Sequence, residues 1–416
     1  MSKIPFQKIT PDKNNNWINL AEDSDWDSLL PVCSKEKGQN AIFAFSSLGV
    51  STNRDEWVYD FDEATLKNKM NYFIDTYNSL LNKKDTSWKP IIKWSRDLKK
   101  KFEYKKSVSF DETLILKSNY RPFTTQFWYA EKILNDILTQ NHYDTFGVNL
   151  DKENKLILIQ GIGIDRPWHC LSSKYLPHLQ ITPNGQFVPL YRYHNGTRID
   201  NITDWALEQF RAHYKTEDIS KESIFCYIYA VLHNPAYRQK YELNLKRDFP
   251  RIPFYNNFGQ WAAWGKELMD LHIGYETIEP YPLVRKDIKP KEGKPKVPNL
   301  LSALEPANLL LENADEYTFV PKAKLKTDKE QGLIMIDDLT TLMGVPVAAW
   351  EYKLGNRCAL EWVLDQYKEG KPSDPTIAER FNTYRFADYK EFVIDLLMRV
   401  CRVSVETMRI VDAMKD

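Results

Sequence analysis

The chain has 416 residues, of which 43% are hydrophobic and 27% are charged, so it is long enough for two or three globular lobes and too apolar to be disordered. Its 57 Lys and Arg residues balance its 57 Asp and Glu residues, which excludes a global positive field that would attract a polyanion. Any nucleic-acid surface must therefore arise from local segregation of charge.

Cysteine usage and the N-terminal residues bear on the compartment. The five cysteines are widely spaced and form no Cys-x-x-Cys pair, which argues against a disulfide framework or a zinc knuckle and fits a reducing environment. The start, Met1-Ser2-Lys3-Ile4-Pro5, lacks the apolar core of a signal peptide, and no stretch approaches the length of a membrane span. We therefore expect a cytoplasmic protein without a membrane partner.

Residues 1–200 are predicted to form a mixed α/β lobe. Short apolar runs bounded by Gly, Asn, Asp or Pro predict strands at 41–48, 114–117, 156–159 and 187–190. Between these runs, residues 63–81 and 91–102 have helical spacing, with Leu66, Met70 and Phe73 on one face of the first helix.

The remaining chain is predicted to form a helical lobe at 201–285, a Lys/Pro-rich linker at 286–300 and a small lobe at 301–416. Prolines in the linker interrupt any periodicity, because proline removes a backbone donor and fixes φ. The last lobe is predicted to contain strands at 317–325, 332–336 and 347–353, followed by helices at 357–367 and 389–414. The fold class is therefore α+β: a mixed-sheet recognition lobe, a helical lobe and a small C-terminal sheet-plus-helix lobe.

Two fragments imitate the cofactor and substrate motifs of enzymes. The run Leu156–Gln160 followed by Gly161-Ile162-Gly163 resembles a dinucleotide-binding turn, but it has no third glycine, and Pro167 falls where a helix should begin. The tetrapeptide Asn234-Pro235-Ala236-Tyr237 resembles the Asn-Pro-Pro-Tyr motif of amino-methyltransferases without its second proline, so Pro235 is expected to open a helix instead.

A third fragment imitates a nuclease. Asp337 or Asp338, followed by Glu351-Tyr352-Lys353 on a predicted strand, would put Glu351 and Lys353 on one face, where two carboxylates could hold Mg²⁺. The alternative is a solvated strand face. The seven histidines show no ligand spacing, and a Walker loop is absent. We therefore assign no catalytic and no metal-binding residues.

The positive signal is for binding. Residues 83–106 contain ten Lys or Arg residues with interleaved aromatic residues, and the apolar face of the predicted helix turns several lysines outward. Lys99, Lys100 and Lys101 are therefore expected to contact phosphates, which requires no reading of sequence. An equally weighted alternative is a lysine face that is merely solvated.

Sequence reading requires donor-rich side chains on turns aimed at base edges, because Arg can grip guanine while Asn and Gln match adenine. Three turn regions offer such side chains, and the candidates are Thr52, Asn53, Arg54, Arg121, Asn184, Gln186 and Arg192. Each arginine could instead make a structural ion pair, and Asp55 makes that alternative strongest for Arg54.

Several stretches together resemble the C-terminal target-recognition region of type ISP restriction-modification enzymes, which are single polypeptides. The matching stretches occur in the order of that family and span nearly the whole chain: Gly49–Trp57, Tyr120–Phe123, Pro183–Phe187 with Pro189–Tyr191, Tyr229–His233 with Pro235–Arg238, Phe249–Pro253 and Gly355–Val363. The family's cofactor motif and tetrapeptide lie upstream of a stretch like Thr10–Trp17, where this chain begins, so we expect a truncated or split-gene part of a longer enzyme.

The resemblance implies a sequence-specific double-stranded DNA recognition module that is not itself an enzyme. Its partners would be DNA and the adenine-N6 methyltransferase and motor/nuclease domains of the parent polypeptide. S-adenosylmethionine, ATP and Mg²⁺ are expected only in those upstream domains, with no cofactor in this segment. The alternatives are a divergent stand-alone methyltransferase or Asp/Glu-x-Lys nuclease, and a protein-interaction scaffold.

Overall fold

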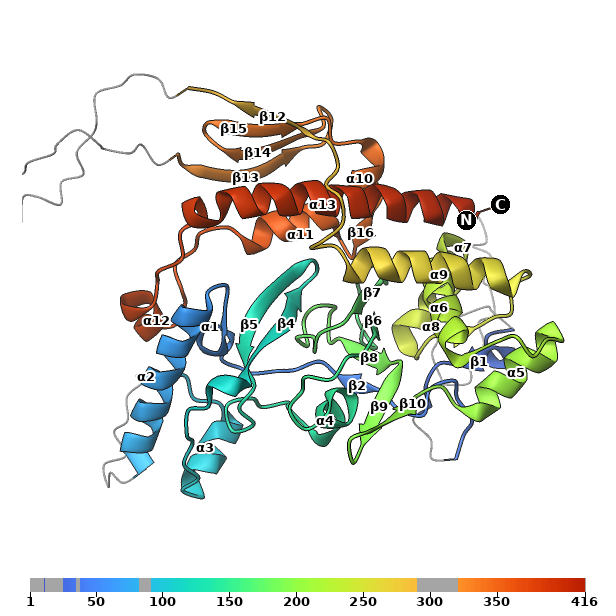
Figure 1. The fold of residues 1–416 in the computed structure, drawn as a ribbon, viewed down its shortest axis with the longest axis horizontal. Coiled ribbons are helices and arrows are strands. Elements are labelled where there is room, and N and C mark those ends of the chain that lie inside the picture. The colour runs from blue at the N-terminus through green and yellow to red at the C-terminus, as the bar shows by residue number, and fades with distance from the viewer. Residues whose placement is uncertain (1–10, 12–24, 35–37, 82–90, 290–320, 416) are drawn as a thin grey trace, which may run out of the picture.

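The computed structural model describes residues 11, 25–34, 38–81, 91–289 and 321–415. Helices and strands are mixed along the chain and the strands form small antiparallel sheets, so the predicted α+β class is confirmed. Figure 1 shows two long helices, α9 (Phe258–Ile273) and α13 (Phe386–Ala413), running across the molecule. Within the described ranges, no helix combines the length and apolarity that a membrane crossing needs.

The first region is built on two sheets. The strand order of one is β3-β5-β4, formed by Tyr59–Asp60, Thr124–Tyr129 and Ile115–Arg121. The strand order of the other, the central sheet, is β2-β8-β6-β7, formed by Ser47–Leu48, Gln186–Pro189, Leu156–Ile159 and Cys170–Ser173. The helices are α1 (Asp55–Val58), α2 (Glu63–Leu81), α3 (Arg96–Glu103) and α4 (Gln140–Phe146), and β9 (Tyr191–His194) pairs with β10 (Thr197–Asp200) in a separate hairpin.

The predicted helical region follows. It comprises α5 (Asp204–Tyr214), α6 (Lys221–Val231), α7 (Pro235–Lys240), α8 (Glu242–Arg247) and α9. A short strand, β11 (Arg251–Ile252), returns to pair with β1 (Leu30–Pro31). Pro235 occupies the first turn of α7, where its missing N–H costs nothing, and the Asn234 side chain accepts a hydrogen bond from the Tyr237 amide at 3.0 Å. The fragment is therefore a helix cap.

The C-terminal region places a four-stranded sheet on one side of α13 (Figure 1). Its strand order is β12-β15-β14-β13, formed by Val284–Asp287, Thr340–Met343, Leu333–Asp337 and Ala323–Asp328. The remaining elements are α10 (Val347–Glu351), β16 (Lys353–Leu354), β17 (Arg357–Cys358), α11 (Ala359–Gln366) and α12 (Pro375–Arg380). The predicted linker thus begins in strand β12, and its residues from 290 onward lie outside the described part.

Two hydrophobic cores cross the expected lobe boundaries. One joins Phe73 of α2 and Trp128 of β5 with Leu397 of α13. The other joins Ile157 of β6 and Phe225 of α6 with Met414, just past the end of α13. The boundaries at 200, 285 and 300 stay predictions, but the regions that they separate bury apolar surface against one another.

Three predictions of local structure are wrong. Residues 347–351 form helix α10, because the side chains of Ala349 and Trp350 are both buried when the chain makes a helical turn after Pro346. The prediction of a strand failed because a short apolar run cannot distinguish helix from strand. Glu351 and Lys353 therefore do not share a strand face. Arg192 lies within strand β9 rather than on a turn, and only residues 47–48 of the predicted strand 41–48 are extended in a ladder.

Candidate nucleic-acid interface

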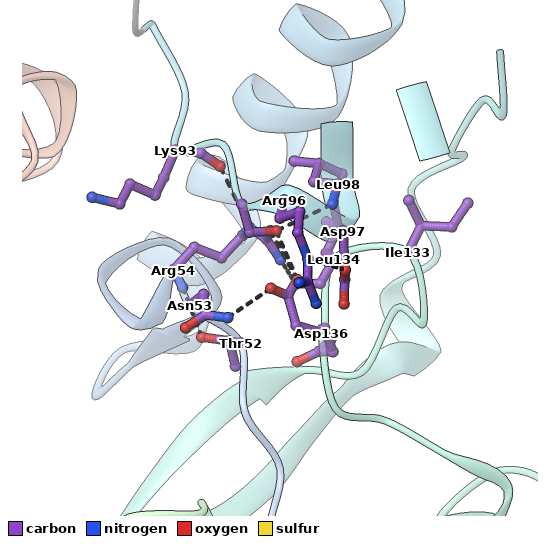
Figure 2. Close-up of polar contacts among 12 residues, drawn as sticks. Thr52, Asn53, Arg54, Lys93, Arg96, Asp97, Leu98, Ile133, Leu134 and Asp136 are labelled. Atoms are coloured by element: carbon purple, nitrogen blue, oxygen red, sulfur yellow. Dashed lines mark hydrogen bonds and ion pairs between the residues drawn. The ribbon is translucent and has the colours of Figure 1, made fainter. Parts of the chain in front are cut away.

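The loop before α1 is held by a buried arginine. Figure 2 shows the Arg54 guanidinium pointing into a cluster of acceptors: it donates to the Leu134 carbonyl, to Ser95 Oγ at 2.6 Å and to Asp136 Oδ1 at 3.2 Å. Arg54 is only 2% exposed. Burial lowers its pKa, and the charge of Asp136 opposes that effect. Its donors are committed within the fold, so Arg54 positions the loop and is withdrawn as a candidate for a base contact.

Asn53, in contrast, is presented to solvent. Its backbone is left-handed, with φ of 54°, a conformation that Asn tolerates better than most residues. Its Nδ2 donates to Asp136 Oδ2 at 2.7 Å, so the carboxamide is oriented by the same carboxylate that binds Arg54 (Figure 2). Thr52, however, is fully buried, and its hydroxyl donates to Asp55. Thr52 therefore shapes the turn and, like Arg54, is not placed to touch DNA.

Arg121 and His178 fix the other side of this loop. Arg121 Nη1 lies 2.9 Å from His178 Nδ1, and the Gln180 amide donates to the same nitrogen at 3.0 Å. Because both groups can only donate, Nδ1 is an acceptor and the proton is assigned to Nε2, which donates to Asp55 at 3.0 Å. Burial works to raise the pKa of Asp55, but His178, Thr52 and Arg121 lower it to about 2.

The Arg121 guanidinium also lies 3.9 Å from the centre of the Tyr120 ring. Its neighbour Phe123 is 1% exposed and packs edge-on against Tyr275 after α9. The turn after β4 is thus a contact between regions, and Arg121 supports the loop at residues 51–55 from behind.

The segment 178–186 forms a second loop beside the first. Leu179 donates to the Val50 carbonyl at 2.7 Å, Gly49 donates to the Gly185 carbonyl at 3.0 Å, and Gly161 donates to the Pro183 carbonyl at 2.9 Å. A Cβ at Gly161 would lie 2.5 Å from the Asn184 carbonyl oxygen, so the glycine turn after β6 permits this close approach. The Gly161-Ile162-Gly163 fragment thus has a backbone role.

Asn184, like Gln180, is exposed on this second loop. Its φ is 47°, and its Oδ1 accepts from Gln180 at 3.4 Å. Gln186 is half-buried at the start of β8, where it pairs with Ile159. Asn53 and Asn184 therefore stand on adjacent loops, each in a left-handed conformation and each tied by backbone hydrogen bonds or a buried carboxylate.

A cavity of about 470 Å³ opens between the two loops. On its far wall, the Glu56 carboxylate accepts from the backbone amides of Ser373 and Asp374 at 2.9 and 2.8 Å, and Trp57 Nε1 donates to Asp374 at 2.8 Å. We call these contacts the 56–374 staple. They fasten the beginning of α1 to the segment before α12.

The lysine-rich segment 83–106, which we call the lysine ridge, shares the anchor of the first loop. Ser95 caps α3 by accepting from the Leu98 amide, and its hydroxyl also donates to Asp136 at 2.8 Å. Lys99 and Lys100 are exposed, but Lys101 donates to the carbonyls of Lys132 and Ile133 at 3.1 and 3.0 Å. Burial lowers the pKa of Lys101. Lys101 is therefore tied to the fold, and the ridge residues at 83–90 lie outside the described residues.

Arg192 stands apart from these loops. Gln186 pairs with Ile159 at one end of β6 and Pro189 pairs with Leu156 at the other, so Arg192 follows the end of the central sheet remote from Asn184. Its Nε is buried and has no hydrogen-bond partner within the described part of the chain. Arg192 thus belongs to a separate surface.

The acidic residues of the nuclease-like fragment do not lie together in the structure. The Asp337 carboxylate accepts from the amides of Leu339 and Thr340 and pairs with Lys390 at 2.7 Å, so it holds the turn between β14 and β15. Glu351, at the end of α10, lines a different cavity of about 680 Å³. The described residues contain no cluster of three His, Cys, Asp or Glu side chains placed to hold a metal ion.

Sequence reasoning missed Asp136, the residue that joins the first loop to the start of α3. It lies 82 positions from Arg54 in an unremarkable loop, so no spacing in the sequence connects the two. It also missed His178 and Gln180, because neither has a motif around it.

Comparisons with known proteins agree with this architecture. The chain matches the family model of the Type ISP C-terminal specificity domain over residues 41–396. It is 45% identical to a chain of the DrdV–DNA complex solved by cryo-EM, with a TM-score of 0.87, covering 99% of this chain and 40% of that chain. No curated protein matches it significantly.

Two Type ISP restriction-modification enzymes have the same fold. A nuclease-deletion mutant of LlaGI in complex with a DNA substrate mimic is 26% identical, with a TM-score of 0.75. The match covers 99% of this chain and 30% of that chain. ATP-dependent LlaBIII bound to DNA is 23% identical, with a TM-score of 0.78. The match covers 99% of this chain and 25% of that chain. This chain therefore spans 40% or less of the length of these structures. Because the family model covers most of its residues, the chain belongs to the Type ISP C-terminal specificity domain family.

Proposed function

We propose that this chain is the sequence-specific DNA target-recognition module of a larger restriction-modification enzyme. The carrying observation is that Asn53 and Asn184 are exposed on adjacent loops whose backbones are fixed by the Arg54–Asp136 cluster and by the contacts of residues 49–50 and 161. A carboxamide can pair with adenine N6 and N7 in the major groove. Because the loops are already ordered, little of the gain from those hydrogen bonds would be lost to ordering entropy.

The partners follow from the family. In this proposal the module positions an upstream adenine-N6 methyltransferase, with motor and nuclease domains, on double-stranded DNA. S-adenosylmethionine, ATP and Mg²⁺ serve those domains, and the chain by itself neither methylates nor cuts DNA. Methyl transfer by the isolated chain, or Mg²⁺-dependent cleavage that Glu351→Ala abolishes, would contradict this assignment.

A selection experiment tests the central claim. The chain is mixed with a pool of randomised duplexes, and the DNA that it shifts on a gel is sequenced over several rounds. We expect one asymmetric sequence to be enriched. Binding without enrichment would reduce the chain to a nonspecific module, and absence of binding would favour a protein-interaction scaffold.

Arg192 lies beyond the end of the central sheet that is remote from Asn184. In this proposal it therefore makes a second contact with DNA, separate from that of the two loops. Arg192→Ala is expected to cost about 1 to 3 kcal/mol on the selected duplex and much less on random DNA, if Arg192 grips a guanine. An equal loss on both duplexes would identify a phosphate contact instead, and a fall in Tm without any loss of binding would identify a structural role.

A further inference from the structure

A second cavity, of about 740 Å³, lies at the end of the central sheet remote from Asn184. Leu156 of β6 pairs with Ser173 and with Pro189, so the residues next to these pairs, among them Lys155, Lys174 and Tyr191, gather at this end. The beginning of β4 and the C-terminal end of α9 complete the walls. A volume of this size is in the range of roughly 300 to 1,000 Å³ that is usual for small-molecule sites.

The interior of this cavity is apolar. Leu116, Trp128, Leu176 and Ile273 line it, and Trp128 and Leu176 belong to the main hydrophobic core. Such walls accept a flat ring or an alkyl group, and they offer few polar partners to a small hydrophilic molecule. A ligand must therefore bring an apolar or aromatic part.

The rim is cationic and aromatic. Lys174 Nζ lies 5.2 Å from the centre of the Tyr175 ring, and the Arg198 guanidinium lies 4.3 Å from the centre of the Tyr191 ring. Lys117 is brought to the same rim, because the neighbouring Ser118 hydroxyl donates to the Leu176 carbonyl at 2.7 Å.

Unpaired positive charge predominates at this rim. Within the described residues, four cations at the rim make no ion pair: Lys117, Lys152, Lys174 and Arg198. Two acids at the rim also make none, Asp151 and Glu153. Lys155 pairs with Glu222, and Asp270 pairs with Lys266. The excess of two positive charges, four minus two, favours an anionic group at the rim.

The rim is also held in place. The buried Asn154 side chain donates to the Tyr191 carbonyl at 2.9 Å and accepts from the Tyr191 amide at 3.2 Å. Tyr193 donates to the Glu153 carbonyl at 2.7 Å, so residues 153–154 and β9 move as one piece. The backbone that carries the Tyr191 ring at the rim is thus fixed before a ligand binds.

We propose that this cavity is a mononucleotide site, with the base in the apolar slot and the phosphate on Lys117, Lys174 and Arg198. Aromatic rings combined with arginine and lysine are the side chains on which nucleobases stack and phosphates bind. The phosphate belongs at the rim because the α9 C-terminus, at Gly274, carries negative partial charge that repels it. The nucleotide is either free in solution or extruded from a duplex; this site goes beyond target recognition.

Titration of AMP, adenosine and inorganic phosphate into the full chain, followed by calorimetry, tests the site. We expect AMP to bind more tightly than either fragment. Replacement of Lys117, Lys174 and Arg198 together by Ala should weaken AMP binding at least tenfold, and all three are exposed, so the variant should keep its Tm. Lys132→Ala is the matched control, because that exposed lysine lies 5.9 Å from the Tyr143 ring, outside the cavity.

A second arm distinguishes the source of the nucleotide. Duplexes carrying 2-aminopurine opposite an abasic position are titrated, and a fluorescence change that the triple variant abolishes would identify an extruded nucleotide. Absence of both signals in the wild-type chain, or either signal unchanged in the triple variant, overturns the proposal. Asn184→Ala should leave AMP binding unchanged, so failure of target recognition is detected independently.

Discussion

Arg54 has the side chain expected of a base contact, but its role in this chain is to hold the loop before α1 in place. Its side chain is fully buried and that of Asp136 is 8% exposed, so Arg54→Ala would leave a nearly buried carboxylate without its charged partner. Breaking such a pair costs about 3 to 5 kcal/mol. We expect urea denaturation to report a loss of that order.

Arg96→Ala provides the control for this measurement. Arg96 begins α3 next to the cluster, but its side chain is 91% exposed, and an exposed ion pair contributes at most about 1 kcal/mol. Equal stability losses in the two variants would contradict the positioning role of Arg54.

Asn184 should behave differently, because its carboxamide faces solvent. We expect Asn184→Ala to weaken binding to the selected duplex by about 1 to 3 kcal/mol and to leave binding to random DNA nearly unchanged. Asn195→Ala is a matched control: Asn195 is also exposed and left-handed, with φ of 49° against 47°, so both variants carry the same backbone penalty. Competition binding measures the difference, and identical losses in the two variants would contradict a base contact at Asn184.

At the scale of elements, helix α3 divides its lysines between two roles. Replacing Lys99 and Lys100 by Ala should flatten the dependence of log K on log salt by about 0.9 for each phosphate contact that is lost, on any duplex. Lys101→Ala should instead lower Tm, because its ammonium group bonds two carbonyls that precede the Leu134–Asp136 loop. An unchanged salt slope in the double variant would show that the ridge is only solvated.

The sequence predicted those elements whose signal is periodic and local. Helix α2 has the predicted bounds because six buried residues of its nineteen repeat at helical spacing. Residues 347–351 were mistaken for a strand because five residues span little more than one helical turn and show no period. The exposure of individual loop side chains could not be predicted from the sequence either. Thr52 and Asn53 are adjacent and polar, and only tertiary contacts decide that Thr52 is buried and Asn53 is exposed to solvent.

At the scale of the molecule, five buried histidines make stability depend on pH. They are at most 4% exposed, and burial lowers the pKa of each, to about 4 for His169 and to about 3 for His272; the others are His142, His178 and His233. In the folded chain these histidines therefore bind protons less readily than in the unfolded chain, which takes up protons below about pH 6.5.

Stability is therefore lost as pH falls below that value, by up to about 1.4 kcal/mol per pH unit for each histidine. Carboxylates with ordinary unfolded-state pKa values of about 4 contribute little above about pH 5, so the histidines dominate that window. The urea midpoint should fall clearly between about pH 7 and about pH 5.5. A constant midpoint would mean that these histidines protonate within the fold.

The 56–374 staple has a consequence for engineering new specificities. Glu56 and Trp57, which follow Arg54 by two and three residues, bond directly to Ser373 and Asp374. A chimera joined anywhere between these two segments therefore takes one half of the contact from each parent. Such a hybrid would inherit mismatched partners even if every base-reading residue came from one donor. The smallest transferable unit on this side is thus discontinuous: residues 51–57, 95, 134–136 and 178–186 together with residues 373–374.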